Sequence, residues 1–255
     1  MTNLNNALVA QAGLRTWYSD HARKLPWRLT PSLYGTWLSE ILLQQTQVGT
    51  GLPKWHLFLE RFPTVGHLAR ASESDVLKAW EGLGYYRRAT LLHKAARAIE
   101  VAGEFPMSYD AWLKLPGVGP YTAAAIASIG LGEAVAAVDG NVQRVVARWA
   151  GITDPVDGKT GAQAVQKVAD AWLDHDAPGN HNQAVMELGA LVCKPRNPSC
   201  MLCPISSHCA SANSPDMWGV LPAKKLKKKV QRWALTWHIA RFEKDIVVSQ
   251  RPESG

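Results

Sequence analysis

Apolar positions recur along most of the chain with the spacing of helices that bury one face. Over residues 4–18 this spacing is followed by Leu4, Leu8, Leu14 and Trp17. Apolar residues three and four positions apart lie on one side of an α-helix, so each such segment predicts a helix packed against a core. The pattern predicts further helices over residues 34–45, 47–61, 64–71, 73–81, 86–101, 108–114, 120–131, 139–150, 161–175 and 180–192.

Residues that stop helices separate these segments. Leu25-Pro-Trp-Arg28 ends the first helix, and Gly82-Leu-Gly84 ends the helix over 73–81 as a glycine C-cap does. Strand-like alternation of apolar and polar residues does not occur before residue 231. We therefore predict an all-α fold.

The sequence changes character after residue 223. The run Lys224-Lys-Leu-Lys-Lys-Lys229 predicts a basic linker over residues 224–230, and residues 233–241 and 245–250 have the pattern of two hairpin strands. A hairpin alone is marginally stable in water. We therefore expect residues 231–255 to be the start of a second domain.

Composition narrows the classes of partner. The chain has 255 residues, 47% of them hydrophobic, and a net charge of +7. This content supports a packed core, and the positive charge favours a polyanionic partner. No apolar run is long enough to span a membrane, and the N-terminus lacks the basic-then-apolar pattern of an export signal. We expect a cytoplasmic protein.

The chain's four cysteines lie in one short segment. Cys193, Cys200, Cys203 and Cys209 have the spacing C-x6-C-x2-C-x5-C. Four thiolates so close in sequence can converge on one metal centre, and a four-sulfur site suits zinc or an iron–sulfur cluster. Disulfides are the alternative, which the lack of an export signal disfavours.

A glycine-rich turn lies between two predicted helices. In Leu115-Pro-Gly-Val-Gly-Pro-Tyr121, Gly117 and Gly119 stand just before a helix that begins at Pro120. Glycines permit unusual backbone angles and expose N–H groups, and a helix N-terminus favours an anion. The segment predicts a helix–hairpin–helix that grips phosphate, with an ordinary connection between packed helices as the alternative.

Together these segments resemble a known superfamily. The hairpin, Asp139 and the cysteine spacing match the helix–hairpin–helix DNA glycosylases that carry a 4Fe–4S cluster, which include endonuclease III and the MutY-type adenine DNA glycosylases. The second type resembles the chain more closely, over nearly its whole length. The segments similar to its signatures are Leu25-Pro-Trp-Arg28, Trp37-Leu-Ser-Glu-Ile-Leu-Leu-Gln-Gln-Thr-Gln-Val48, Trp80-Glu-Gly-Leu-Gly-Tyr-Tyr86 and Val138-Asp-Gly-Asn-Val142.

The resemblance implies catalytic roles for four residues. Glu40 lies in an apolar helix, where desolvation raises the pKa of a carboxyl and suits it to donate a proton. In the family this glutamate protonates adenine and then assists water. Asp139 is placed to cap the following helix, and its family counterpart stabilises the sugar cation with support from Asn141. Tyr121 replaces the lysine that forms a Schiff base in lyase-type relatives, so we expect hydrolysis alone.

The resemblance also implies DNA contacts. A target base inside a duplex must be flipped out and its gap filled. Gln44, Gln45 and Tyr85 are similar to the family's wedge and intercalating residues, with surface or core packing as the alternative. Gly117 and Gly119 belong to the hairpin that holds the backbone. The residues expected to line the base pocket are Arg23, Trp27 and Arg28.

The resemblance implies two helical subdomains with the active site in the cleft between them. One spans residues 25–137, and the other combines residues 1–24 with 138–223 and the cluster. The implied activity is removal of adenine opposite 8-oxoguanine or guanine in double-stranded DNA, by a monomer. The resemblance also implies a bacterial protein in the cytoplasm, associated with the nucleoid through DNA binding. One rival is a glycosylase–lyase for oxidised pyrimidines, which Tyr121 disfavours. Another is a non-catalytic DNA-binding module with structural zinc, which the paired acids Glu40 and Asp139 disfavour.

The tail Val248-Ser-Gln-Arg-Pro-Glu-Ser-Gly255 resembles the start of the family's Nudix-like C-terminal domain. We expect that domain to be truncated in this chain. Because it recognises the oxidised base in the family, we also expect weak discrimination between 8-oxoguanine and guanine.

Overall fold

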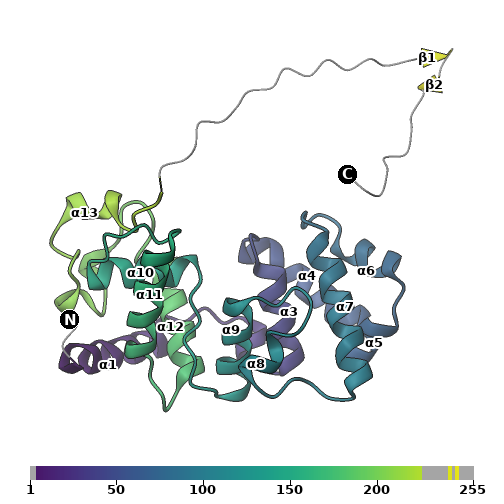
Figure 1. Cartoon of the computed structure of the whole chain (residues 1–255), viewed down its shortest axis with the longest axis horizontal. Helices are drawn as coiled ribbons and strands as arrows, with labels where there is room; N and C mark the ends of the chain where they lie inside the picture. Colours follow the sequence, from purple (N-terminus) through teal and green to yellow (C-terminus); the bar gives the residue numbers. More distant parts are fainter. Residues whose placement is uncertain (1–3, 226–240, 243–244, 247–255) are drawn as a thin grey trace. The chain divides into compact units, whose positions relative to one another are not determined.

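The computed structural model describes residues 4–225, 241–242 and 245–246, which fall into two units. In the described part of the first unit, Met1–Lys225, the regular elements are helices, which confirms the predicted helical fold (Figure 1). In the second unit, β1 (Arg241–Phe242) pairs antiparallel with β2 (Asp245–Ile246). The remainder of the predicted hairpin, and most of the predicted linker 224–230, lie outside the described residues.

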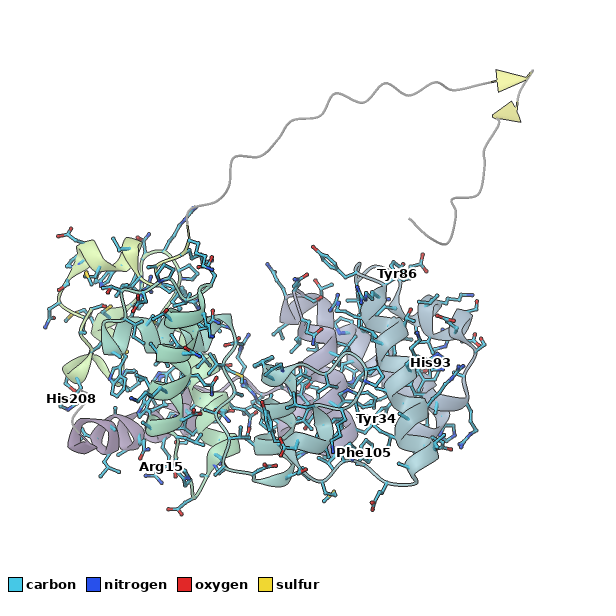
Figure 2. The ribbon with its side chains drawn as sticks, viewed as in Figure 1. Arg15, Tyr34, Tyr86, His93, Phe105 and His208 are labelled. Atoms are coloured by element: carbon cyan, nitrogen blue, oxygen red, sulfur yellow. The ribbon has the colours of Figure 1, made fainter. Side chains whose placement is uncertain are left out.

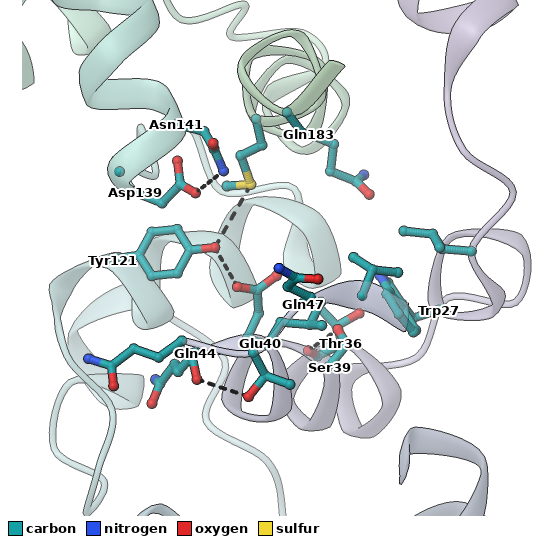
Figure 3. A pocket seen from close by; sticks show the side chains of 18 of the residues that line it. Trp27, Thr36, Ser39, Glu40, Gln44, Gln47, Tyr121, Asp139, Asn141 and Gln183 are labelled. Carbon is teal, nitrogen blue, oxygen red and sulfur yellow. Dashed lines mark hydrogen bonds between the residues drawn. The ribbon is translucent and has the colours of Figure 1, made fainter. Parts of the chain in front are cut away.

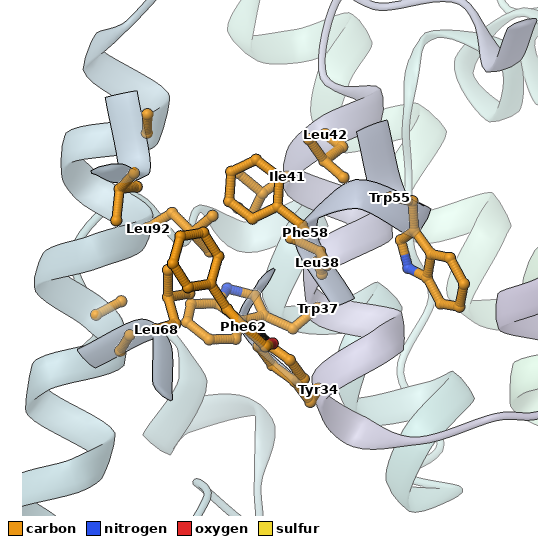
Figure 4. Packing of buried hydrophobic residues seen from close by; sticks show 14 of the residues in the cluster. Tyr34, Trp37, Leu38, Ile41, Leu42, Trp55, Phe58, Phe62, Leu68 and Leu92 are labelled. Carbon is orange, nitrogen blue, oxygen red and sulfur yellow. Dashed lines mark hydrogen bonds between the residues drawn. The ribbon is translucent and has the colours of Figure 1, made fainter. Parts of the chain in front are cut away.

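One hydrophobic cluster is built by consecutive short helices. The tryptophans Trp37, Trp80 and Trp112 are fully buried in it together with Phe58. Figure 4 shows Trp37 and Phe58 among their apolar neighbours. The Trp37 and Trp112 rings lie 5.9 Å apart, so aromatic packing joins helices that are distant in sequence. The helices are α2 (Pro26–Leu29), α3 (Leu33–Leu43), α4 (Val48–Arg61), α5 (Val65–Arg70), α6 (Glu73–Trp80), α7 (Arg87–Ala102), α8 (Tyr109–Trp112) and α9 (Pro120–Leu131).

A second cluster combines the N-terminal helix with the later part of the chain. Trp149 stacks on Trp172 with ring centroids 4.6 Å apart, and Leu14 is buried against the same group. Side chains fill the space between the helices of both clusters (Figure 2). The elements are α1 (Leu4–His21), α10 (Gly140–Ala150), α11 (Lys159–Trp172), α12 (Pro178–Leu191), two 3₁₀ turns (Cys200–Leu202 and Ser206–His208) and α13 (Pro215–Val220). The subdomain bounds 25–137 and 1–24 with 138–223 stay a prediction.

Helix α9 connects the two clusters, because it packs against α3 on one side and α12 on the other. At the second contact Gly179 approaches α9 so closely that a Cβ would lie 2.6 Å from the Ser128 carbonyl oxygen. Asn182 donates to Ser128 Oγ at 2.8 Å and to the Val135 carbonyl at 2.9 Å. The buried amide therefore fixes α12 against α9, which sets the width of the space between α3, α10 and α12.

All the predicted helices are present, but some begin or end at other residues than predicted because of local hydrogen bonds or turns. Helix α11 ends at Trp172 rather than 175, because Asp174 accepts a hydrogen bond from the Asp176 N–H and forms a turn. Helix α8 is one turn long, since the chain leaves it for the hairpin. The sequence pattern missed α2 and α13, which both begin with proline. Within the described residues, no helix combines the length and apolar character needed to cross a membrane.

Candidate active site

A cleft of ≈ 1170 Å³ opens between the two clusters, walled by parts of α3, α9, α10 and α12 (Figure 3). It gathers most of the residues singled out from the sequence. The two hairpin glycines and the four cysteines lie outside its lining. The sequence-predicted residues that line it are Arg23, Trp27, Arg28, Glu40, Gln44, Gln45, Tyr85, Tyr121, Asp139 and Asn141.

Helix α3 brings Glu40 into the lining of the cleft. The helix begins at the N-cap Ser32, whose hydroxyl accepts from the Gly35 N–H, and most of its residues are buried. Desolvation raises the pKa of Glu40 to about 7, and the nearby charge of Asp139 adds to the rise. A hydrogen bond from Tyr121 and the charge of Arg28 oppose it. The carboxyl is therefore partly protonated near neutral pH, as the apolar run predicts.

Tyr121 lies in the first turn of α9, directly after the hairpin. Its hydroxyl donates to Glu40 Oε2 at 2.6 Å and also contacts Met186 Sδ at 3.9 Å (Figure 3). Burial, followed by the charges of Glu40 and Asp139, raises the pKa of Tyr121 well above its usual value. The phenol is therefore a neutral hydrogen-bond donor over the whole range in which Glu40 titrates.

Asp139 caps α10, as its position in the sequence predicts. Its Oδ1 accepts from the Val142 N–H at 2.7 Å, and its Oδ2 accepts from Asn141 Nδ2 at 2.9 Å. Burial raises the pKa of Asp139, while these hydrogen bonds and the charge of Arg144 oppose the rise. The carboxylate thus faces the cleft with donors that favour its ionised form.

A buried arginine continues this network toward the cysteine segment. Arg144 Nη2 donates to Asn141 Oδ1 at 2.8 Å and to the Gly189 carbonyl at 2.8 Å. Its Nε donates to the Cys193 carbonyl at 2.7 Å. Asn141 is therefore held from both sides, which fixes the orientation of its amide toward Asp139.

Glu187 of α12 is a cleft residue that the sequence analysis did not single out. It is fully buried, and it accepts from Arg23 Nε at 2.7 Å, Arg23 Nη2 at 2.8 Å and Arg28 Nη2 at 3.0 Å. Burial alone would raise its pKa, but the hydrogen bonds from Arg23 and Arg28 lower it to about 2. The signal available was an acidic residue inside the apolar run Ala184-Val185-Met186-Glu187-Leu188, the same signal that indicated Glu40.

The proposed wedge residues stand at the edge of the cleft. Gln44 Nε2 donates to Thr122 Oγ1 at 3.2 Å, whereas Gln45 is exposed. Tyr85 is 69% exposed, so most of its ring is accessible at this edge. Gln45 and Tyr85 both have left-handed backbone angles, with φ values of 55° and 46°.

The hairpin connects α8 to α9 on the outside of the cleft. Gly117 has a φ of 78°, which L side chains rarely adopt. A Cβ there would also lie 2.7 Å from Leu91 Cβ, so the backbone angle and the lack of space both require glycine at this position. Gly119 is the N-cap residue of α9, and Pro120 occupies the first helical position. Both glycines are exposed, so their backbone is accessible to a partner.

The four cysteines line one small cavity beside Val145 and Trp149. Arg148 is buried against it: its Nη1 donates to Cys193 Sγ at 3.5 Å and to the Lys194 carbonyl at 2.6 Å. Its Nη2 donates to the Pro195 carbonyl at 3.0 Å. A cationic side chain therefore shapes the loop that presents the thiols.

The donor set fits an iron–sulfur cluster. Burial, followed by repulsion among the thiolates, raises the pKa of Cys200, and burial raises that of Cys203 to about 12. Such thiols need a bound metal centre to ionise. Among the described residues, no three His, Cys, Asp or Glu side chains are grouped to hold a metal ion. All four cysteines line one shared cavity, and a set of four thiol ligands suits a multi-iron cluster. When bound, the cluster would supply the positive charge that holds Cys193, Cys200, Cys203 and Cys209 as thiolates.

Comparisons with known proteins agree with this geometry. Residues 38–170 match the family described as "HhH-GPD superfamily base excision DNA repair protein", and residues 193–209 match the "Iron-sulfur binding domain of endonuclease III". The chain is 27% identical to the protein in "Structure of a thermostable thymine-DNA glycosylase", with a TM-score of 0.74, covering 82% of this chain and 97% of that one.

Two similar proteins from distant organisms both carry the name adenine DNA glycosylase. The chain is 35% identical to the adenine DNA glycosylase of Buchnera aphidicola (subsp. Schizaphis graminum), over 93% of this chain and 69% of the relative. It is 41% identical to that of Homo sapiens, over 78% of this chain and 38% of the relative. The chain therefore belongs to the MutY-type adenine DNA glycosylases, within the helix–hairpin–helix superfamily of base excision DNA repair proteins.

Proposed function

We propose that this chain removes adenine mispaired with 8-oxoguanine or guanine, by hydrolysis of the N-glycosidic bond without strand cleavage. The observation that carries the proposal is the convergence of Glu40, Tyr121 and Asp139 in one cleft, with unequal environments for the two carboxyls. Two titratable groups held in different environments divide into an acid and an ionised partner.

The proposed steps follow from these environments. A flipped adenine occupies the cleft, and the protonated form of Glu40, available because its pKa is about 7, donates a proton to the departing base. The sugar then carries positive charge, which the Asp139 carboxylate stabilises. Deprotonated Glu40 next accepts a proton from the attacking water. Asn141 and the Val142 N–H keep Asp139 ionised and oriented.

Tyr121 supports hydrolysis without a lyase step. A lyase forms a Schiff base between an amine and the sugar, and a phenol supplies no amine. Among the described residues that line the cleft, the cations are arginines and none is a lysine. Arginine remains protonated and is not a nucleophile at neutral pH. These features favour an intact abasic strand as the product.

The edge of the cleft and the hairpin support double-stranded DNA as the substrate. Gln44, Gln45 and Tyr85 line the cleft, and we assign to them the filling of the gap that a flipped base leaves in the stack. The exposed Gly117 and Gly119 are suited to a phosphate, and the net charge of +7 favours a polyanion. One chain supplies both carboxyls, the edge of the cleft and the hairpin. We therefore propose that the protein acts as a monomer.

A single-turnover assay tests the proposal. Duplexes carrying adenine opposite 8-oxoguanine, guanine or cytosine are incubated with excess protein, and strand breaks are counted with and without hot alkali. We expect alkali-dependent breaks opposite 8-oxoguanine and guanine and few opposite cytosine. Breaks of equal yield without alkali, or trapping of the protein on DNA by borohydride, would show a lyase and contradict the monofunctional mechanism.

A further inference from the structure

Two short segments at the edge of the cleft adopt uncommon backbone conformations. The glutamine segment (residues 44–46) and the tyrosine segment (residues 82–86) each contain a non-glycine residue with positive φ, Gln45 and Tyr85 respectively. Among the described residues the remaining non-glycine residue of this kind is Asn197. Such conformations persist where surrounding contacts over-determine them. One side chain, that of Arg88 in the first turn of α7, contacts both segments.

Arg88 holds the glutamine segment through the Gln44 carbonyl and the Thr46 hydroxyl, and it also binds carbonyls at the end of α3. Helix α3 ends just before this segment, so its last carbonyls lack partners within the helix. A cation at this end also complements the helix dipole. Arg88 Nη1 donates to the carbonyls of Ile41 at 3.1 Å, Leu42 at 3.3 Å and Gln44 at 2.5 Å, and Nη2 donates to Thr46 Oγ1 at 3.4 Å.

The same guanidinium holds the tyrosine segment. Arg88 Nη2 donates to the Leu83 carbonyl at 3.1 Å and the Gly84 carbonyl at 3.5 Å. The guanidinium carbon lies 4.9 Å from the Trp80 ring centroid and 5.9 Å from that of Tyr85. Trp80 Nε1 in turn donates to the Gly84 carbonyl at 2.9 Å. The guanidinium of Arg88 therefore lies within cation–π distance of the exposed Tyr85 ring.

We propose that Arg88 is a positioning residue that joins the glutamine and tyrosine segments into one preformed edge, which enters DNA as a unit when the base is flipped. This inference rests on the proposed function, because a rigid edge matters only if a duplex is opened. A segment that is ordered before binding spares the complex the entropy cost of ordering it. The planar fork of arginine can serve both segments at once, whereas the single ammonium of lysine cannot.

The alternative role for Arg88, contact with a DNA phosphate, fits the contacts poorly. Both terminal nitrogens already donate to protein oxygens, and the side chain is half-buried between two rings. Its neighbour Arg87 is exposed and provides a matched control. Arg88→Lys and Arg87→Lys both conserve charge, so a difference between them reports the lost fork rather than a change in electrostatic attraction.

Amide hydrogen exchange in the free protein tests directly whether Arg88 holds the glutamine and tyrosine segments together. The Thr46 N–H is bonded to the Leu43 carbonyl and the Leu83 N–H to the Trp80 carbonyl, so each segment has a protected reporter. Arg88→Lys should speed exchange at both amides by about tenfold, and Arg87→Lys at neither. Amides in the middle of α9 should be unchanged, which separates local release from global destabilisation. Unchanged exchange at either reporter, or equal acceleration throughout the chain, would overturn the proposal.

Excision measurements test the consequence for DNA. We expect Arg88→Lys to slow adenine release from a paired duplex by about tenfold. When an abasic analogue stands opposite the adenine, we expect slowing of less than threefold, because flipping an unpaired adenine costs less free energy and depends less on the edge. Equal slowing on both duplexes would refute an action through base flipping. Failure of the proposed function has a different signature, namely no adenine release by the unmodified chain from any duplex, while the exchange result stands by itself.

Discussion

Removal of the Tyr121 hydroxyl should change the pH dependence of excision in a definite direction. The hydroxyl donates to Glu40 Oε2 at 2.6 Å and thereby lowers the pKa of Glu40, which lies at about 7 with the bond in place. A hydrogen bond to a charged group contributes ~1.5–3 kcal/mol, and one pKa unit corresponds to ~1.36 kcal/mol. Tyr121→Phe should therefore raise the pKa of Glu40 by at least ~1 unit.

The sign of the effect follows from the role of the protonated acid. Excision needs Glu40 with its proton, so the rate is present below its pKa and declines as the pH rises through it. Between pH 6 and pH 8 an acid of pKa 7 loses about tenfold in protonated fraction, whereas an acid of pKa 8 loses about twofold. In Tyr121→Phe the alkaline decline should thus move to higher pH, so that the rate falls only about twofold between pH 6 and pH 8.

Single-turnover rates from pH 6 to pH 9 provide the assay. Tyr109→Phe is the matched control, because Tyr109 lies in α8 and does not line the cleft. Its profile should coincide with that of the unmodified chain. An alkaline decline that stays in place, or moves to lower pH, in Tyr121→Phe would show that this hydroxyl does not set the pKa of the catalytic acid.

Three further predictions concern the acids and the cluster. Glu187→Gln should lower the free energy of unfolding by about 3 kcal/mol at pH 7, since it leaves Arg23 and Arg28 without their buried partner. The pKa of Glu187 is lowered to about 2, so its stabilisation is full above pH 4.5 and is lost as the pH falls toward 2. Denaturant melts should show the gap between the two proteins closing over that range, and a gap that stays constant would exclude the ion pair as its source. Glu40→Gln and Asp139→Asn should each slow single-turnover excision at least ~100-fold while DNA dissociation constants change little. A near-normal rate in Glu40→Gln would remove it as the acid. Cys200→Ser should reduce iron content and brown colour, whereas the exposed Ser207→Ala should not. Stoichiometric zinc without iron in anaerobically purified protein would contradict an iron–sulfur cluster.

Features with a local cause were predictable from the sequence. Asp139 was expected to cap a helix because it precedes an apolar-periodic segment, and its side chain does accept from the Val142 N–H. The raised pKa of Glu40 followed from the apolar residues around it, which bury the same helix in the structure. The cysteine spacing indicated a metal centre because four ligands within one loop need no knowledge of the fold.

Features that depend on distant contacts were not predictable. Arg23 and Arg28 were expected in the pocket, but their partner Glu187 lies more than 150 residues away and is brought to them by the packing of α12 against α1. Arg88 binds backbone carbonyls, and carbonyl acceptors leave no pattern in a sequence. The position of the cleft between the clusters likewise depends on α9, whose two packing faces become distinct only in the folded chain.

The identity of the released base tests directly whether the cleft is an adenine-specific site. A duplex with one adenine opposite 8-oxoguanine is incubated with excess protein, and the small-molecule fraction is analysed by mass spectrometry. We expect free adenine in amounts equal to the abasic sites formed, released at least ~100-fold more slowly with Glu40→Gln. Release of another base, or no release by the unmodified chain while DNA is bound, would contradict the assignment of Glu40 and Asp139 as the centre of an adenine-specific site.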